Sequence, residues 1–463
     1  MKKPNVNFKN PSNQQLNNLI QKYQNKQFSE AEKIATSITH EFPKYQFAWK
    51  LLGLILFRLG KISKAVSAGQ TAVTLSPKDT EAYNNLGSML RELGEFNEAE
   101  KNHLQAIKLK PDFAESHFNL GVIFQQQKRL DKAEKSYLRA IKLKPDYVKA
   151  YNYLGYILRE LGRLDEAEQI YNKALEIEPE NKSILRGRGV VFYDKEKFEL
   201  ALKDFNYCKL EDAKIKALIC LYKLGKKNEI YQKIKDEEIN DSKNLNFASF
   251  SSFISYKYKE DTANNFCKNP LDFINISNLS SHIENPNSFI KKLIDELKNF
   301  KITKNPYDKA TKNGFQTIPY FNIFKNATGT LKNLETIISE ERKLYYLKFK
   351  NKNCTFIKKF LYAKKLIGWH VILKKHGYQE AHIHPTGWLS GVIYLKIVPS
   401  LKKNEGSIEF SLNKIYDNDP KMPLTIHEPK TGDIILFPST LHHRTIPFST
   451  NTDRVVIAFD LMP

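Results

Sequence analysis

Cysteine is scarce in this chain, and long apolar runs are missing altogether. The four cysteines among 463 residues (Cys208, Cys220, Cys267 and Cys354) show neither the CxxC spacing of a zinc site nor the density of a disulfide-rich domain. No run of 18 apolar residues is present, and the start MKKPNVNFKN has no apolar stretch of a secretory signal. We therefore expect a cytoplasmic protein that does not enter a membrane.

Acidic residues are also few relative to basic ones. The chain has 51 Asp and Glu against 73 Lys and Arg, which gives a net charge of +22. Such an excess indicates nucleic-acid binding when it gathers in one stripe. Here it is spread over both halves, and lysine far outnumbers arginine, as an A/T-biased genome would produce. Coding bias explains the charge better than a nucleic-acid partner does.

The first half of the chain repeats with a period of 34 residues. Three residue types keep this interval: Pro43, Pro77, Pro111, Pro145 and Pro179; Ala31, Ala65, Ala99, Ala133, Ala167 and Ala201; Gly53, Gly87, Gly121, Gly155 and Gly189. Within each unit, apolar residues recur at helical spacing, and the small residues let two helices approach closely. One such unit cannot bury its apolar face alone, so neighbouring units must stack.

This pattern resembles the tetratricopeptide repeat, a pair of antiparallel helices. The best unit, TEAYNNLGSMLRELGEFNEAEKNHLQAIKLKPDF, spans residues 80–113. We expect a disordered N-terminus over residues 1–11 and an all-α solenoid over 12–236, with a degenerate C-terminal cap. The resemblance implies a protein or peptide partner. Asn85 and Asn119, at the sixth position of their units, are candidates for binding it, although solvated helix positions would look the same.

The second half changes in character. Residues 237–264 are polar and rich in serine, which favours a linker. Two stretches further on, NSFIKKLIDELKNF and TLKNLETIISEERKLYYLKF, predict helices. Beyond Lys365, short runs rich in Val, Ile, Phe and Tyr are divided by turn residues. Several strands without helices between them suggest a sandwich or a barrel.

Seven of the eleven histidines lie in the last hundred residues. His382 and His384 stand just before the strand WLSGVIYLKIV, and residues i and i+2 of an extended chain point the same way. His442 and His443 follow the strand DIILFPS, and Arg454 opens the last strand. A His-x-His pair with a distant third histidine is typical of metal ligands, because imidazole suits first-row transition metals.

The order of these motifs resembles the 2-oxoglutarate/Fe(II) oxygenases, in particular a bacterial branch often joined to tetratricopeptide repeats. The resemblance covers roughly residues 265–463. It implies a double-stranded β-helix (jelly roll) with flanking helices that binds Fe(II) through His382, His384 and His443. It also implies that 2-oxoglutarate is the cosubstrate, held by Arg454, and that no side chain beyond the metal centre is catalytic.

The residue pattern of the last strand also indicates that Arg454 binds a carboxylate. Alternation along RVVIAFD sends Arg454 and Asp460 to one face and Ile457 to the other. An unpaired buried charge is strongly unfavourable, and Asp460 lies roughly 20 Å away along an extended strand. The distal carboxylate of 2-oxoglutarate is the partner that we expect for Arg454.

Two questions stay open at the level of sequence. Most of the superfamily has a carboxylate where His384 stands, so either His384 is the third ligand or water completes the site. Three functions also compete. We expect a 2-oxoglutarate- and Fe(II)-dependent dioxygenase (hydroxylase) whose repeats bind a partner or substrate. The alternatives are a cupin-like metal protein without 2-oxoglutarate and a non-catalytic repeat scaffold with a degenerate oxygenase domain.

Overall fold

The chain forms two compact units, Met1–Lys214 and Ile215–Pro463, each of which is described by itself. The computed structural model describes residues 10–463 except 241–243, 305–308, 318–321, 400 and 418. Most of the N-terminus that was expected to be disordered, 1–11, lies outside the described residues. No helix within the described ranges is both long and apolar enough to cross a membrane.

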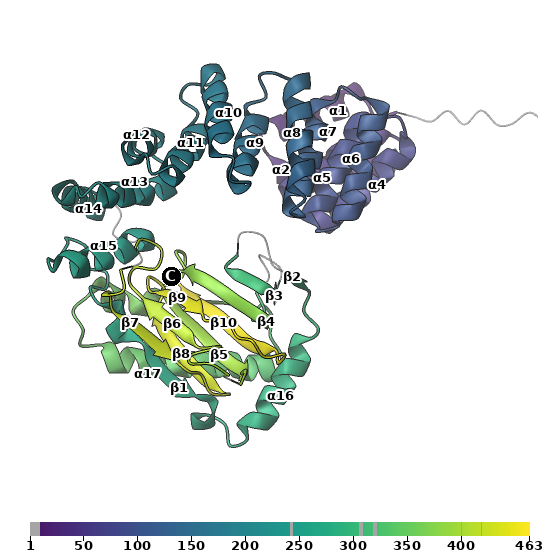
Figure 1. Cartoon of the computed structure of the whole chain (residues 1–463). Coiled ribbons are helices and arrows are strands. Elements are labelled where there is room, and N and C mark those ends of the chain that lie inside the picture. The colour runs from purple at the N-terminus through teal and green to yellow at the C-terminus, as the bar shows by residue number, and fades with distance from the viewer. Residues whose placement is uncertain (1–9, 241–243, 305–308, 318–321, 400, 418) are drawn as a thin grey trace, which may run out of the picture. The chain divides into compact units, whose positions relative to one another are not determined.

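The first unit is a series of helix hairpins that confirms the all-α solenoid (Figure 1). Its helices are α1 (Asn13–Gln24), α2 (Phe28–Glu41), α3 (Gln46–Arg58), α4 (Ile62–Leu75), α5 (Thr80–Glu92), α6 (Phe96–Leu109), α7 (Ala114–Gln126), α8 (Leu130–Leu143), α9 (Val148–Glu160), α10 (Leu164–Ile177), α11 (Lys182–Asp194) and α12 (Phe198–Cys208). Buried alanines of the 34-residue pattern line the contact within each hairpin, where larger side chains would hold the helices apart.

The repeated glycines make room for a ring from the second helix of the same hairpin. A Cβ atom on Gly121 would lie 2.5 Å from the ring of Tyr137, and one on Gly87 would lie 2.7 Å from Nε2 of His103. The ring position also keeps the 34-residue period, with His103, Tyr137, Tyr171 and Phe205 in successive hairpins. The period therefore encodes a matched pair of a glycine and a ring.

The second unit begins earlier than the sequence suggests. Helices α13 (Glu211–Lys223) and α14 (Lys227–Asn240), expected as the solenoid's cap, fall mostly or wholly after Lys214. The expected linker, 237–264, contains helix α15 (Leu245–Tyr258), which is buried along most of its length. The serines of this segment do not mark a solvated linker. Ser252, for example, is buried and donates its hydroxyl to backbone carbonyls. The functional division of the chain into domains stays a prediction.

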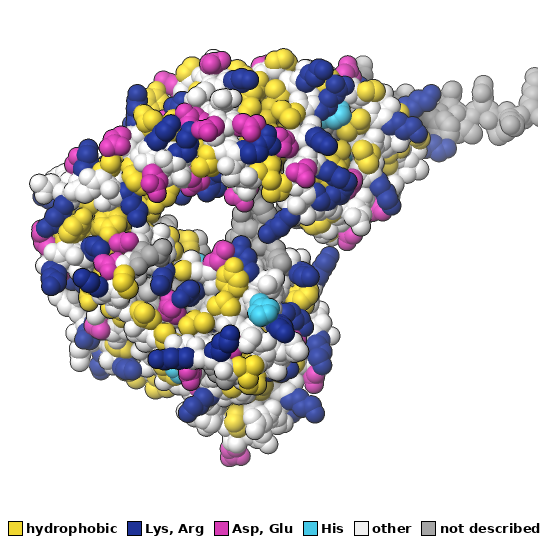
Figure 2. All heavy atoms as spheres, viewed as in Figure 1, with side chains coloured by type: hydrophobic (Ala, Val, Ile, Leu, Met, Phe, Trp, Pro, Cys, Tyr) yellow, Lys and Arg dark blue, Asp and Glu magenta, His cyan; other side chains and the backbone are white. Residues whose placement is uncertain are grey.

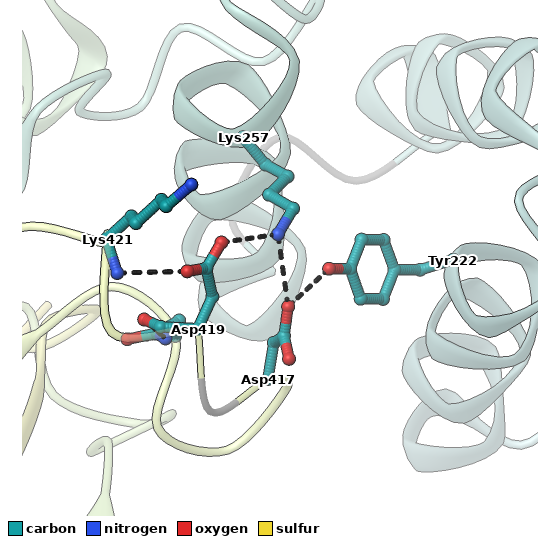
Figure 3. Close-up of polar contacts among 6 residues, drawn as sticks. Tyr222, Lys257, Asp417, Asp419 and Lys421 are labelled. Atoms are coloured by element: carbon teal, nitrogen blue, oxygen red, sulfur yellow. Dashed lines mark hydrogen bonds and ion pairs between the residues drawn. The ribbon is translucent and has the colours of Figure 1, made fainter.

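Helix α15 is joined to the sheet region by aromatic and ionic contacts. Phe250 and Phe253 pack on Tyr416, with ring centroids 5.1 and 5.3 Å apart. Figure 3 shows Lys257 of α15 reaching the carboxylates of Asp417 and Asp419, at 3.3 and 2.7 Å. In the same cluster the hydroxyl of Tyr222, from α13, donates a hydrogen bond to Asp417. Both helices are thus tied to the loop that follows strand β6 (Ile408–Ser411).

The sheet is antiparallel and curls back on itself. Its strands are β1 (Asn275–Asn278), β2 (Ile302–Lys304), β3 (Thr311–Thr317), β4 (Lys365–His382), β5 (Leu389–Lys396), β6 (Ile408–Ser411), β7 (Leu424–His427), β8 (Asp433–Pro438), β9 (His442–Thr445) and β10 (Arg454–Met462). The order is β1-β8-β5-β10-β4-β9-β6-β7, with β3 added to β4 and β2 to β3. The first half of β4 pairs with β10 and its end pairs with β9, so β4 belongs to both halves. This topology confirms the double-stranded β-helix.

Alternation along β10 separates a helix-covered face from an interior face. Ile457, Phe459 and Leu461 join a core with residues of α16 (Pro286–Leu297) and α17 (Gly329–Phe349), the flanking helices in Figure 1. Arg454 and Asp460 are buried on the opposite face. Shorter helical segments, α18 (Thr355–Lys358), η1 (Pro270–Phe273), η2 (Leu279–Ser281) and η3 (Phe360–Tyr362), lie between these elements. The interior row of β10 therefore carries the charged residues.

The surface agrees with the sequence argument about charge. On the face shown in Figure 2, lysine and arginine side chains alternate with acidic and apolar ones and form no single stripe. Several lysines and arginines are also paired with carboxylates within each unit, such as Arg163 with Glu134 and Glu166. A stripe of the kind that tracks a phosphate backbone is not formed on that face.

Candidate metal centre

Three histidines from two strands and one loop meet where the end of β4 pairs with β9. His382 ends β4 and lies opposite His443 of β9 in the strand register, while His384 follows two residues later. The ring centroids of His382 and His443 are 4.3 Å apart, and His384 lies 5.1 and 4.9 Å from them. One ring nitrogen from each histidine lies within 4.8 Å of the others, so this group could hold a metal ion.

Backbone carbonyls fix the orientation of two of the rings. Nδ1 of His382 lies 2.7 Å from the carbonyl oxygen of Glu380, and Nδ1 of His443 lies 3.1 Å from that of Leu441. A carbonyl oxygen only accepts, so Nδ1 carries the proton in both rings and the lone pair is left on Nε2. Burial lowers the pKa of His382 to about 4 and that of His443 well below its ordinary value. Both rings are neutral at pH 7, as metal ligands must be.

A carboxylate takes the place of the carbonyl at the third ring. Nδ1 of His384 lies 2.6 Å from Oδ1 of Asp460, and the hydroxyl of Ser390 donates to the same carboxylate oxygen at 2.7 Å. The backbone N–H of His384 donates to the carbonyl of Ser439 at 3.0 Å. All three histidines therefore present Nε2, with Nδ1 already engaged. This set of donors fits a first-row transition metal.

His442, the immediate neighbour of His443, faces away from the cluster. Its Nε2 lies 3.1 Å from the hydroxyl of Ser249 on α15, and its ring packs at 4.8 Å from that of Tyr416. Successive residues of a strand point to opposite faces, which explains the division of roles. Of the two candidates, the structure brings His443 to His382.

Arg454 is buried without a charged partner on the interior row. Its side chain is 2% exposed, and its guanidinium carbon lies 4.8 Å from the ring centroid of Tyr394. Nε and Nη1 of Arg454 and the hydroxyl of Tyr394 have no hydrogen-bond partner within the described part of the chain. Burial lowers the pKa of Arg454, since the charged form loses hydration. A buried guanidinium in this state fits a carboxylate ligand.

A histidine of the β unit and the two asparagines of the solenoid lie outside this group. His427 pairs with Asp433 at 2.9 Å, and Asp433 also caps the turn before β8, which agrees with a structural role. In the solenoid, Asn119 donates its side-chain N–H to the Oδ1 of Asn84 at 2.9 Å. Asn119 is thus engaged within the repeats, and Asn85 is half-buried on α5. Partner binding by either stays a prediction.

Sequence reasoning missed the residues that hold His384. The alternation along β10 did place Asp460 on the interior face, but its contact depends on the loop after β4, for which the sequence gives no pattern. The serines of this group, Ser390 and Ser439, were not singled out at all. Their hydroxyls lie 2.8 Å apart, and each comes from a different strand or its end.

Comparison with known families separates the two parts of the chain. Residues 368–460 match a family described as "Putative 2OG-Fe(II) oxygenase". This matched segment contains all three histidines of the cluster and Arg454. Three tetratricopeptide-repeat families match residues 21–80, 87–128 and 112–180. No curated protein matches the chain.

Among solved structures, the chain is similar to several over part of its length. MamA is 27% identical, with 34% of this chain and 93% of MamA covered and a TM-score of 0.33. The protein pilF of Pseudomonas aeruginosa is 16% identical, with 45% of this chain and 97% of pilF covered and a TM-score of 0.40. A thermophilic tetratricopeptide-repeat protein of Thermus thermophilus is 24% identical, with 39% and 98% covered and a TM-score of 0.34.

Proposed function

We propose that this chain, which carries tetratricopeptide repeats and a C-terminal 2OG-Fe(II) oxygenase domain, is an Fe(II)- and 2-oxoglutarate-dependent dioxygenase. It hydroxylates a substrate, and its repeats bind that substrate or another protein partner. The observation that carries the proposal is the buried Arg454, whose Nε and Nη1 have no partner within the described residues. A cupin-like site without 2-oxoglutarate gives that guanidinium no carboxylate.

The histidines and Arg454 have separate tasks in this proposal. His382, His384 and His443 bind Fe(II) through Nε2, because each Nδ1 is engaged elsewhere. Arg454 holds the distal carboxylate of 2-oxoglutarate, and the hydroxyl of Tyr394, which has no hydrogen-bond partner within the described residues, donates a second hydrogen bond to it. The bound iron and cosubstrate would supply oxidation by O2, which yields succinate, CO2 and a hydroxylated product.

Aromatic side chains cover the imidazole of His443, the buried member of the cluster. The ring of Phe437 packs 4.7 Å from that of His443, and Phe410 lies 6.4 Å from it on the neighbouring strand. Both phenylalanines are fully buried. A dry wall on this side strengthens the electrostatic attraction between a metal and its ligands and limits side reactions with solvent.

The direct test is turnover of the cosubstrate. Full-length protein is loaded with Fe(II) under anaerobic conditions, and succinate is measured after 2-oxoglutarate and O2 are added. Succinate in excess of a metal-free control supports the dioxygenase. If the protein binds metal but neither forms succinate nor binds 2-oxoglutarate, the cupin-like alternative is favoured. If it binds no metal, the scaffold is favoured.

The role of the repeats needs its own test. Full-length chain serves as bait in a lysate, beside Asn85→Ala and Asn119→Ala variants. We expect the Asn85 variant to lose partners that the parent captures. Asn102→Ala, on α6, is the matched control, because that side chain donates to the backbone of Glu98 within its own helix. Equal capture by all variants would remove these asparagines from the binding surface.

A further inference from the structure

The carboxylate behind His384 is part of a closed network of hydrogen bonds. Asp460 is 7% exposed, and its Oδ1 accepts from both His384 and Ser390. Ser390 in turn bonds to the hydroxyl of Ser439 at 2.8 Å. These residues come from β10, from β5 and from the end of β8, so three strands converge on one imidazole. Within the cluster, His384 has a carboxylate at Nδ1, whereas His382 and His443 have neutral carbonyls there.

The loop that carries His384 is shaped to fit this network. The backbone N–H of Gly387 donates to the carbonyl of His384 at 3.1 Å and closes a tight turn. A Cβ atom on Gly387 would lie 2.8 Å from the Ser439 hydroxyl and 2.9 Å from the carboxyl carbon of Asp460. A side chain at this position would therefore push the loop away from Asp460. The approach of His384 to the carboxylate is a built feature of the turn.

We propose that Asp460 is a positioning residue for the metal centre, and this proposal rests on the metal site proposed above. It holds His384 with Nε2 directed to the metal, so that His384 is the third ligand. It also supplies negative charge to the site through the imidazole of His384. In the usual two-histidine, one-carboxylate site, that charge comes from a carboxylate bound directly to the metal. A carboxylate at Nδ1 orients a ligating imidazole and makes it a stronger base toward the metal.

The chain contains a second buried pair of the same kind, which offers a matched control. Asp433 contacts His427 at 2.9 Å, but His427 does not belong to the cluster that could hold a metal. Both aspartates are buried and lie on strands, Asp433 at the start of β8 and Asp460 within β10, and each bonds to one imidazole nitrogen, Nε2 of His427 and Nδ1 of His384. They differ in whether that imidazole reaches the cluster. Replacing each aspartate by asparagine keeps the shape and removes the charge.

The test compares full-length parent, Asp460→Asn, Asp433→Asn and His384→Ala. Binding of Co(II), a spectroscopic substitute for Fe(II), is measured by calorimetry, and its visible absorption spectrum is recorded. We expect Asp460→Asn to weaken Co(II) binding by about 10- to 100-fold and to shift the spectrum. His384→Ala should lose at least as much. Asp433→Asn should match the parent in both measurements, and thermal unfolding of the metal-free proteins checks that each is folded.

Three results would overturn the role of Asp460. They are Asp460→Asn binding Co(II) as tightly as the parent, an unchanged spectrum in that variant, and an equal loss in Asp433→Asn. If Asp460→Asn does not fold, ¹⁵N-histidine NMR of the metal-free parent decides: the proton must sit on Nδ1 of His384, and a proton on Nε2 contradicts the proposal. Succinate formation by a parent whose Asp460→Asn variant binds metal normally would reject this inference alone. Tight Co(II) binding without 2-oxoglutarate turnover would reject the oxygenase alone.

Discussion

Buried or half-buried histidines occur in both units, and their surroundings differ in a way that separates packing from ligand chemistry. His103 of α6 is fully buried against Gly87, and neither of its ring nitrogens has a hydrogen-bond partner within the described residues. In the second unit, His382, His384 and His443 are each engaged at Nδ1. A ring that only fills space needs no orientation. A ring that donates its lone pair needs one nitrogen held so that the other is directed.

The difference follows from how each unit builds its interior. In the solenoid the place of His103 is taken by Tyr137, Tyr171 and Phe205 in later repeats, so any flat ring serves against the glycine. In the β unit, His384 is engaged by Asp460 of another strand, whereas His382 and His443 are engaged by the carbonyls two residues before them in the chain. No later segment repeats that environment. Burial alone therefore says little about a histidine's role, whereas the partner of Nδ1 says much.

The largest expected effect is the loss of metal binding in His443→Ala. This change removes a directed Nε2 from the cluster, so we expect Fe(II) binding by the anaerobic protein to be abolished in a calorimetric titration. His442→Gln is the matched control, because it alters the neighbouring imidazole that contacts Ser249 instead. Unchanged affinity in His443→Ala would show that directed nitrogens do not mark the metal site.

Next in size is the effect of Arg454 on the cosubstrate. A hydrogen bond to a charged group contributes roughly 1.5–3 kcal/mol, so Arg454→Ala should weaken 2-oxoglutarate binding by at least about tenfold. Arg454→Lys keeps the charge but loses the planar pair of donors, so its affinity for 2-oxoglutarate should lie between those of the parent and Arg454→Ala. Both variants should bind Fe(II) like the parent. A titration in which Arg454→Ala binds 2-oxoglutarate as tightly as the parent would contradict this assignment.

The sequence predicts the fold wherever a pattern is regular. A 34-residue period specifies the helix hairpins, and alternation in β10 places Arg454 and Asp460 on the interior face. The same reasoning fails for α15, because its mix of phenylalanine and serine has neither a polar face nor a clear helical stripe. Ser249 and Ser252 are buried through hydrogen bonds that composition does not reveal.

The site is predicted in its members but not in its connections. The spacing of His382, His384 and His443 indicates a metal site, although His384 lies in the loop beyond β4 and not on the strand that ends at His382. The pairing of His384 with Asp460 joins residues 76 positions apart through a loop whose turn is set by Gly387. Contacts of this kind depend on tertiary packing, and no local propensity predicts them.

In the solenoid, the free energy of unfolding should depend on pH through His103, whose ring nitrogens have no hydrogen-bond partner within the described residues. Burial lowers the pKa of His103 to about 3 from about 6.5, so the unfolded chain takes up a proton that the folded chain does not. Stability is therefore fully present above pH 6.5 and is lost as pH falls toward 3, by up to about 1.4 kcal/mol per pH unit. His103→Phe should flatten this dependence in denaturant unfolding of the first unit.

The control for that comparison is His117→Phe. His117 lies on the next helix, α7, and its Nε2 is directed to the carbonyl of Pro111. It is not enclosed against a glycine as His103 is, so its replacement tests whether the loss of any histidine from the repeats changes the slope. An equal flattening by both substitutions would assign the effect to something other than burial of the ring.

The smallest expected effect concerns tyrosines, where each unit again holds a hydroxyl aimed at a carboxylate. Tyr222 bonds to Asp417 in the second unit, and burial followed by that hydrogen bond raises its pKa to about 12 (Figure 3). Tyr222→Phe should cost about 1 kcal/mol in the free energy of unfolding. Because the folded pKa is raised, the parent's advantage should fade as pH rises above about 10. Tyr207→Phe, which removes an exposed bond to Glu180, should cost almost nothing, and an equal cost would mean that enclosure does not matter.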